Sequence, residues 1–293
     1  MDGVLIVNKP SGITSHDVID HLRRASGIKD VGHAGTLDPL AEGVLLCLLG
    51  RATRLTPYLQ ELPKAYRGVI QFGIRTSTQD AEGEVFYQKP APHLTLEQVR
   101  TAAEKFKGRI MQIPPMFSAL RFQGRKLHEL AREGKEVPRE PRPVHIYKLE
   151  ILSLEPGDYP TAAFEVECSK GTYVRTLASD IGDALGVGAH LKQLTRTAIG
   201  NFRLENASTL EQLTDRASIE ARLIPIADAL THLPQWTPTP AVLERLKHGN
   251  FVQAEHPLWT PGGYVVVRDA EGKVALIARW LPPLLRPTRV IQG

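Results

Sequence analysis

The sequence predicts a mixed α/β (α+β) fold, in which a mixed, largely antiparallel sheet with flanking helices precedes a small β-rich domain. Strand-like and helix-like patterns are interleaved from Val4 to about residue 200, and several neighbouring strands are close enough in sequence to form hairpins. Hairpin connections favour antiparallel pairing over a doubly wound parallel sheet. Residues 234–240 (PQWTPTP) hold three prolines, which predicts a domain boundary. We therefore expect domains at 1–233 and 238–293, the first able to fold without the second.

Residues 1–107 carry the clearest helix signals. Ser15 is placed to cap a helix and Gly27 to end it. Thr95 and Gln98 form the capping-box pattern of a second helix. The elements expected here are a strand at 4–7, a helix from 15 to about 27, a buried apolar run at 44–49, a helix at 51–62, strands at 66–72 and 84–87, and a helix reaching Lys107.

The remaining chain adds strands and two further helices. Gly186 and Gly188 are expected to stop the helix that precedes them, and Glu271-Gly272 is expected to turn a hairpin. The elements expected are strands at 144–154 and 162–168, a helix at about 174–185, a short helix at 241–247, and a hairpin of 264–268 with 274–280.

Composition indicates an ordinary globular chain. Of its 293 residues 42% are hydrophobic and 23% charged, and the formal net charge of +4 is compatible with a polyanionic partner. The two cysteines, Cys47 and Cys168, lie in apolar surroundings, which predicts a reducing, cytoplasmic location. The N-terminal stretch lacks the features of a signal peptide, and no apolar run is long enough to span a membrane. No metal-binding or nucleotide-binding pattern is present, so we expect neither metal nor cofactor.

The most informative segment is residues 32–45 (GHAGTLDPLAEGVL), which holds a single carboxylate in a constrained frame. Gly32 and Gly35 allow backbone angles closed to other residues, and Pro39 pushes Asp38 toward an extended conformation. A preset carboxylate suits a nucleophile or a general base. Alone, an Asp before Pro is more often a turn former, so its significance depends on matches elsewhere in the chain.

Five further segments in order along residues 4–200 are informative together. They are residues 7–18 (VNKPSGITSHDV), 64–67 (KAYR), 75–80 (RTSTQD), 114–121 (PPMFSALR) and 168–175 (CSKGTYVR). With the Asp38 frame, these segments resemble the TruB family of tRNA pseudouridine synthases. Asn8 departs from the family, in which many members carry Asp. The resemblance implies the pseudouridine synthase fold, Asp38 as the catalytic carboxylate, and a PUA-like RNA-binding domain at 238–293.

The same resemblance implies roles for other side chains. Tyr66 would stack on the target uracil and is a candidate to help remove its C5 proton, and Arg175 would pair with Asp38. Alone, a half-buried strand aromatic and a surface helix Arg would be the ordinary interpretations. The residues implied to bind substrate are His33, Tyr173, Leu194, Lys9 and Asp80. For His33 the implied role is stacking inside the RNA loop, and a plain loop histidine is the alternative.

An insertion at about 114–143 is rich in basic residues. Residues 121–142 carry seven basic side chains, which include Arg121, Arg125 and Lys126. They also carry four glutamates, so the net charge of the segment is +3. Such a run is usually a solvated helical face. Because the family insertion at this place closes on RNA, we interpret it as a mobile clamp for RNA phosphates.

By resemblance, the chain isomerises the T-loop uridine (U55) of tRNA to pseudouridine. The base flips out, the N1–C1′ bond breaks, and the uracil rejoins through C5, with no cofactor. Attack of Asp38 at C1′ and a glycal-like intermediate both remain open. The partner is the T-arm of tRNA, and we expect a monomer. The alternatives are a hydrolase that uses Asp80 as a second carboxylate, for which proximity to Asp38 is unknown, and a non-catalytic RNA-binding or tRNA-folding protein.

Overall fold

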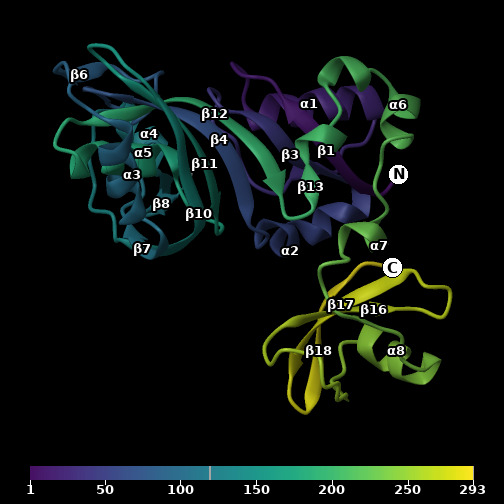
Figure 1. Cartoon of the computed structure of the whole chain (residues 1–293). Coiled ribbons are helices and arrows are strands. Elements are labelled where there is room, and N and C mark those ends of the chain that lie inside the picture. The colour runs from purple at the N-terminus through teal and green to yellow at the C-terminus, as the bar shows by residue number, and fades with distance from the viewer. Residues whose placement is uncertain (119, 293) are drawn as a thin grey trace.

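The computed structural model describes residues 1–118 and 120–292 and contains two main sheets (Figure 1). Residue 119, in the predicted insertion, and residue 293 lie outside the described residues. The large sheet consists of β1 (Gly3–Lys9), β2 (Val31–His33), β3 (Glu42–Leu49), β4 (Lys64–Phe72), β7 (Gly108–Gln112), β10 (Arg142–Glu155), β11 (Thr161–Cys168), β12 (Ala189–Ile199) and β13 (Phe202–Arg203). Its order is β1-β3-β12-β4-β11-β10-β7, with β2 beside β3 and β13 beside β12.

Some helices cover the large sheet, and others follow its last strand along the chain. They are α1 (Ser15–Ser26), the 3-10 helix η1 (Gly50–Leu55), α2 (Thr56–Gln60), α3 (Leu96–Glu104), α5 (Val174–Ala184), η2 (Leu204–Asn206), η3 (Leu210–Gln212), α6 (Arg216–Glu220) and α7 (Ile226–Ala229). One apolar core lies between α3, α5 and strands β4, β10, β11 and β12, and another packs α1 on β1 and β3. The predicted mixed α+β fold, with its largely antiparallel sheet, is confirmed, since the described pairs of the large sheet are antiparallel apart from β3 with β12.

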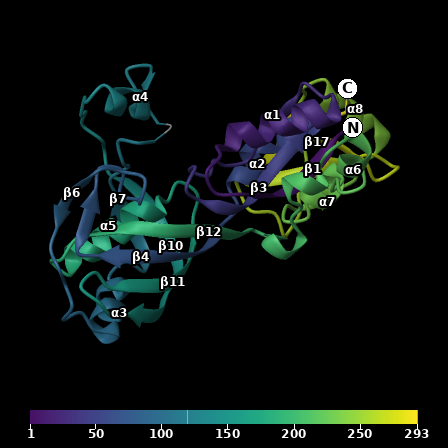
Figure 2. The same cartoon turned by 90° about the horizontal axis from the view of Figure 1, so that it is seen from above.

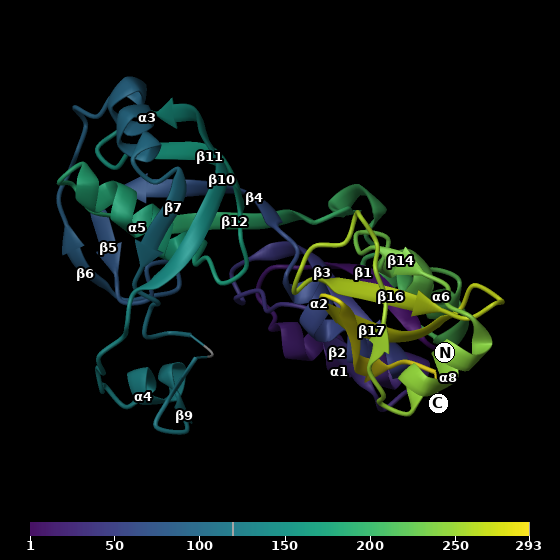
Figure 3. The same ribbon diagram turned by 90° about the horizontal axis from the view of Figure 1, so that it is seen from below.

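Two smaller features leave the large sheet. A hairpin of β5 (Ile74–Thr76) and β6 (Val85–Gln88) follows β4. The insertion between β7 and β10 holds β8 (Arg121–Phe122), β9 (Arg125–Lys126) and α4 (Leu127–Arg132), and it projects from the sheet (Figures 2 and 3). A segment that stands off the body in this way can reach a ligand bound at the sheet.

The last part of the chain forms a separate five-stranded sheet. Its elements are β14 (Gln235–Trp236), α8 (Pro240–Lys247), β15 (Val252–Gln253), β16 (Tyr264–Arg268), β17 (Val274–Leu281) and β18 (Leu284–Val290), with strand order β14-β16-β17-β18-β15. This sheet has its own apolar core with α8. Its assignment as a PUA-like RNA-binding domain stays a prediction.

Two local predictions need correction, and one strand was not predicted. Thr14, not Ser15, caps α1, and the Ser15 hydroxyl instead bonds both backbone groups of Leu37, at 3.0 and 2.9 Å. The helix expected at 51–62 is split, because Pro57 lies in the first turn of α2 and a 3-10 helix precedes it. Strand β12 was not predicted, because register shifts after Leu191 and Arg196 break the two-residue alternation of a strand.

Gly43 allows β12 to lie close beside β3. Its φ is +101°, and a Cβ there would collide with the backbone of Arg196 on β12. The parallel pairing of these strands joins the N-terminal part of the sheet to the rest. A side chain at position 43 would therefore separate two halves of one sheet.

We predict that Gly43→Ala destabilises the protein by about 3 kcal/mol or more, because strain and collision add. Gly27→Ala is the matched control: Gly27 has φ +72° with open space around it, so only the left-handed backbone cost of about 1–2 kcal/mol applies. Urea-induced unfolding of both variants measures the difference. Equal destabilisation would show that β12 does not need the close approach at Gly43.

The second sheet shares an apolar cluster with the first domain. Val266 and Ile277 pack in the same cluster as Leu59 and other residues of the N-terminal part. The rings of Tyr58 and Tyr264 lie edge to face at 4.8 Å, and the Tyr58 hydroxyl lies 3.0 Å from that of Thr288. Removing the tail would expose this cluster, and the independent folding of residues 1–233 stays a prediction.

We predict that a chain ending at Pro234 melts at a lower temperature than the full chain and aggregates on heating. Tyr58→Phe is the control, because it removes the hydroxyl bond to Thr288 but keeps the ring contact, for a loss of about 1 kcal/mol. Calorimetry with light scattering measures both effects. A shortened chain with unchanged melting temperature and no aggregation would contradict the prediction.

Candidate active site

A pocket of about 360 Å³ opens where the Asp38 loop, β4, β12 and the N-terminal end of α5 meet. Its polar lining includes Asp38, Tyr66, Tyr173, Arg175 and Arg196. A larger hollow of about 820 Å³ lies elsewhere, between the N-terminal part and the second sheet, and none of these five residues lines it. The predicted catalytic residues thus converge on one concave site.

Buried polar side chains hold the loop that carries Asp38 through hydrogen bonds to its backbone. The Lys9 ammonium donates to the carbonyls of Pro10, Ile13 and Pro39, at 2.8, 2.7 and 3.3 Å. Ser15 fixes Leu37, the residue before Asp38. Lys9 is 0% exposed and lies under the loop, and its contact with substrate stays a prediction. Burial lowers the pKa of Lys9 to about 8, and the charge of Asp38 opposes this shift.

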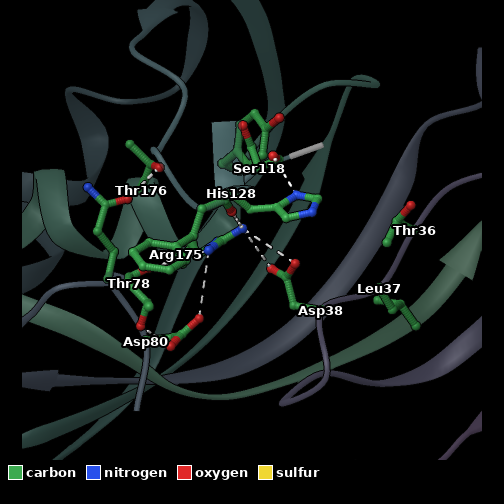
Figure 4. Close-up of polar contacts among 12 residues, drawn as sticks. Thr36, Leu37, Asp38, Thr78, Asp80, Ser118, His128, Arg175 and Thr176 are labelled. Atoms are coloured by element: carbon green, nitrogen blue, oxygen red, sulfur yellow. Dashed lines mark hydrogen bonds and ion pairs between the residues drawn. The ribbon is translucent and has the colours of Figure 1, made fainter. Parts of the chain in front are cut away.

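Arg175 lies between two carboxylates (Figure 4). Its Nη2 is 3.2 Å from Oδ2 of Asp38, and its Nη1 is 3.9 Å from Oδ2 of Asp80. Nη2 also donates to the Phe117 carbonyl at 2.6 Å, which links the base of the insertion to the pocket. Burial raises the pKa of Asp38, whereas the Arg175 guanidinium acts to lower it. The arrangement keeps an anion at the rim of a largely enclosed site.

Asp80 supports Arg175 from behind. Its side chain is buried, and one oxygen accepts from the Thr78 hydroxyl and from the Glu82 N–H. Asp80 does not line the pocket, and the prediction that it contacts substrate stays a prediction. The structure does bring Asp80 near Asp38, on the opposite side of the Arg175 guanidinium, which sequence patterns could not indicate.

Apolar and aromatic side chains form the pocket walls. Tyr66 on β4 and Leu194 on β12 both line it, as predicted for residues around a flat base. Tyr173 lies at the start of α5 with its ring 5.9 Å from the Arg175 guanidinium carbon. The Gln112 amide holds the backbone of Tyr173 with two hydrogen bonds of 3.0 and 2.8 Å. Burial raises the pKa of both tyrosines.

Two buried cations in the lining were not singled out from the sequence. Arg196 follows Leu194 on β12 and donates to three backbone carbonyls. Lys64 starts β4 and donates to the carbonyls of Gln60 and Leu62, and burial lowers its pKa to about 8. Lys64 lies in residues 64–67, which carry the family resemblance, and only the three-dimensional structure shows that both cations are buried.

The remaining predicted residues lie outside the pocket. His33 is on β2 and does not line the pocket; burial lowers its pKa and the Arg196 charge acts in the same direction. Arg121, Arg125 and Lys126 are on the hairpin of the insertion. Arg121 donates to the Gly124 carbonyl at 2.6 Å, and Arg125 pairs with Glu133. Their roles stay predictions.

Within residues 1–118 and 120–292, no cluster of three or more His, Cys, Asp or Glu side chains is arranged to hold a metal ion. Over the same residues, no helix combines the length and the hydropathy needed to cross a membrane.

Comparison with known proteins agrees with the geometry. Residues 23–174 match the model of the TruB family pseudouridylate synthase N-terminal domain, and residues 175–231 match the tRNA pseudouridylate synthase B C-terminal domain. The tRNA pseudouridine synthase B of Symbiobacterium thermophilum is 51% identical over 85% of this chain and 82% of its own. That of Moorella thermoacetica is 42% identical over 99% of both chains.

A solved structure supports the fold as well. A chain of a Cbf5-Nop10-Gar1 complex superposes with a TM-score of 0.78 and 24% identity, covering 99% of this chain and 85% of that one. At this identity the likeness concerns the fold alone. The family matches and the curated relatives decide the question of membership: this chain belongs to the TruB family of pseudouridylate synthases.

Proposed function

We propose that this protein isomerises the T-loop uridine of tRNA to pseudouridine. The observation that carries the proposal is the Asp38 carboxylate, held on a fixed loop at the mouth of an apolar-walled pocket and paired with buried Arg175. The relatives at 42–51% identity are named tRNA pseudouridine synthase B, which supports tRNA as the substrate.

In this proposal the target base flips out of its stack and enters the pocket between Tyr66 and Leu194. Asp38 then promotes cleavage of the N1–C1′ bond, by attack at C1′ or through a glycal-like intermediate. The bonding electrons leave with N1, the uracil turns in the pocket, and a bond forms from C5 to C1′. The C5 proton is lost last and N1 takes up a proton, so no atom is gained or lost overall. An enclosed pocket favours this recombination because it retains the detached base.

The pairing of Arg175 with Asp38 makes the chemistry possible at neutral pH. Partial burial of the Asp38 carboxylate favours protonation, and the adjacent guanidinium counteracts this tendency. Asp80 and the Phe117 carbonyl hold the other sides of Arg175. The guanidinium therefore keeps its orientation when the pocket is empty.

A hydrolase that uses Asp38 and Asp80 as paired carboxylates fits the geometry less well. Asp80 is buried behind Arg175 and absent from the pocket lining, so neither a water molecule nor a leaving group can reach it through the pocket. A protein that only binds RNA would not need a buried cation beside Asp38. Release of tritium from C5-labelled uridine in a tRNA transcript tests the proposal, because isomerisation releases it whereas hydrolysis or binding alone does not.

The proposal includes two further RNA contacts. The projecting insertion, with its excess of basic side chains, would close on phosphates of the T-arm. The C-terminal five-stranded sheet, in a PUA-like role, would contact RNA outside the pocket. The proposal also includes His33 on β2, which would stack inside the RNA loop when the RNA binds. We propose a monomer acting in the cytoplasm, which is consistent with two buried cysteines that form no disulfide.

We predict that Asp38→Asn lowers the rate of pseudouridine formation by about 1,000-fold or more, while tRNA affinity stays nearly unchanged. The amide keeps the shape of the side chain but is neither anionic nor an effective nucleophile. Single-turnover tritium release and filter binding measure the two properties. A purified, deamidation-free variant with more than a few per cent of the wild-type rate would remove Asp38 from the catalytic role.

We predict that Arg175→Met shifts the acid limb of the pH–rate profile to higher pH. Burial already raises the pKa of Asp38, so activity is lost as the pH falls through a value above the ordinary one for Asp, and removing the cation raises that pKa further. Single-turnover rates between pH 4 and 8 give the limb.

Arg175→Lys is the matched variant for that experiment. Lysine retains the charge, so the limb should move less, but it cannot reproduce the contacts of the planar guanidinium and the rate should still fall about 10-fold or more. Identical acid limbs in wild type and Arg175→Met would show that Arg175 does not control the ionisation of Asp38.

A further inference from the structure

We infer that Arg196 is a positioning residue for the reaction: it fixes the Asp38 loop against β12 and places a buried positive charge beside Tyr66. Arg196 lies in the pocket lining and is 1% exposed. The inference rests on the proposed function for its effect on rate. Its effects on the loop and on Tyr66 are properties of the protein alone.

The guanidinium of Arg196 bonds the backbone on both sides of the loop. Nε donates to the Val44 carbonyl at 2.7 Å, on β3 after the loop. Nη2 and Nη1 donate to the carbonyls of Gly35 and Thr36, at 3.1 and 3.3 Å, before Asp38. One planar group thus holds the two ends of the segment that carries the carboxylate. A lysine ammonium cannot reach three acceptors with this fixed geometry.

The strand register places Arg196 between the two catalytic segments. It pairs with Gly43 of β3 on one side and with Tyr66 of β4 on the other. The absence of a side chain at Gly43 lets the backbone of β12 lie against the loop. The distance between Asp38 and Tyr66 is therefore set through one residue of β12.

Arg196 also brings a charge that no carboxylate neutralises by direct contact. Among the ion pairs of the described residues, none includes Arg196, and its hydrogen bonds go to carbonyl oxygens. An apolar side chain of similar length would fill the same volume without the cost of burying a cation. The charge instead stabilises negative charge in the pocket, where the departing uracil carries the electron pair of the broken bond.

Tyr66 is the neighbour on which this charge can be measured. Burial raises the pKa of Tyr66, and the Arg196 guanidinium acts to lower it. Cys168 and Asp38 are the other ionisable groups that influence Tyr66, and both act to raise its pKa. Removing the positive charge of Arg196 should therefore raise the pKa of Tyr66 further.

The test compares Arg196→Met and Arg196→Lys with the control Arg67→Met. Arg67 is also on β4, next to Tyr66, but it is exposed and pairs with Glu165 at 2.7 Å. Four quantities are measured: melting temperature, tRNA affinity, single-turnover rate, and the ionisation of Tyr66 by NMR of isotope-labelled tyrosine. A Tyr66→Phe spectrum assigns the signal.

We expect Arg196→Met to lower the single-turnover rate by about 100-fold, as a displaced catalytic group does. Its tRNA affinity should change by less than about threefold, because the loss is in the chemical step. The pKa of Tyr66 should rise in Arg196→Met and stay near wild type in Arg196→Lys, which keeps the charge. Arg196→Lys should still lose about 10-fold in rate through the lost contacts, and Arg67→Met should match wild type.

A folded Arg196→Met with wild-type rate would overturn the inference. So would an unchanged Tyr66 pKa together with equal losses of stability in both Arg196 variants, since that pattern indicates packing alone. If Arg196→Met does not fold, a folded Arg196→Lys with wild-type rate would overturn it. Failure of the proposed function is seen separately, as a wild-type protein that forms no pseudouridine, and the Tyr66 titration remains measurable in that case.

Discussion

The site depends on keeping one carboxylate ionised at the mouth of a pocket with largely apolar walls. Burial opposes the negative charge of Asp38, and the positive charges of Arg175, Lys9 and Arg196 act against this effect. All three cations are buried around the loop: Lys9, Arg175 and Arg196 are 0, 5 and 1% exposed. The loop and the strands around the pocket provide hydrogen-bond acceptors for these cations.

Most of those acceptors are backbone carbonyls. Lys9 bonds three carbonyls, Arg196 bonds three, and Lys64 bonds two. Carbonyl oxygens satisfy the hydrogen-bonding groups of a cation but leave its charge uncompensated. A pocket surrounded in this way favours anions, both the Asp38 carboxylate and a negatively charged group formed during cleavage of a glycosidic bond. The same hydrogen bonds fix the backbone of the loop. The buried cations therefore set both the charge of the site and the position of Asp38.

The arrangement also connects the site to distant parts of the chain. The insertion reaches the pocket through the Phe117 carbonyl on Arg175, and α1 reaches it through Ser15 on Leu37. The five-stranded sheet packs on the side of β1, β3 and α2 through a shared apolar cluster. Substitutions in any of these elements can therefore move Asp38 without touching a bound nucleotide.

Local sequence by itself determined the mixed fold, the Asp38 frame and the short motifs that indicate the family. These features depend on neighbouring residues: capping pairs, strand alternation, and glycines and a proline around one Asp. The tertiary structure alone decided that Asp80 lies behind Arg175, that Lys9 is buried under the loop, and that Arg196 joins β3, β4 and the loop. Strand β12 illustrates why local sequence was not enough. Its bulges break the alternation that predicts a strand, whereas its pairing with β3 and β4, which are distant in sequence, places it within the large sheet. Burial and charge pairing arise from contacts between residues far apart in the chain, such as Asp38 with Arg175, which are 137 positions apart, and no local pattern records them.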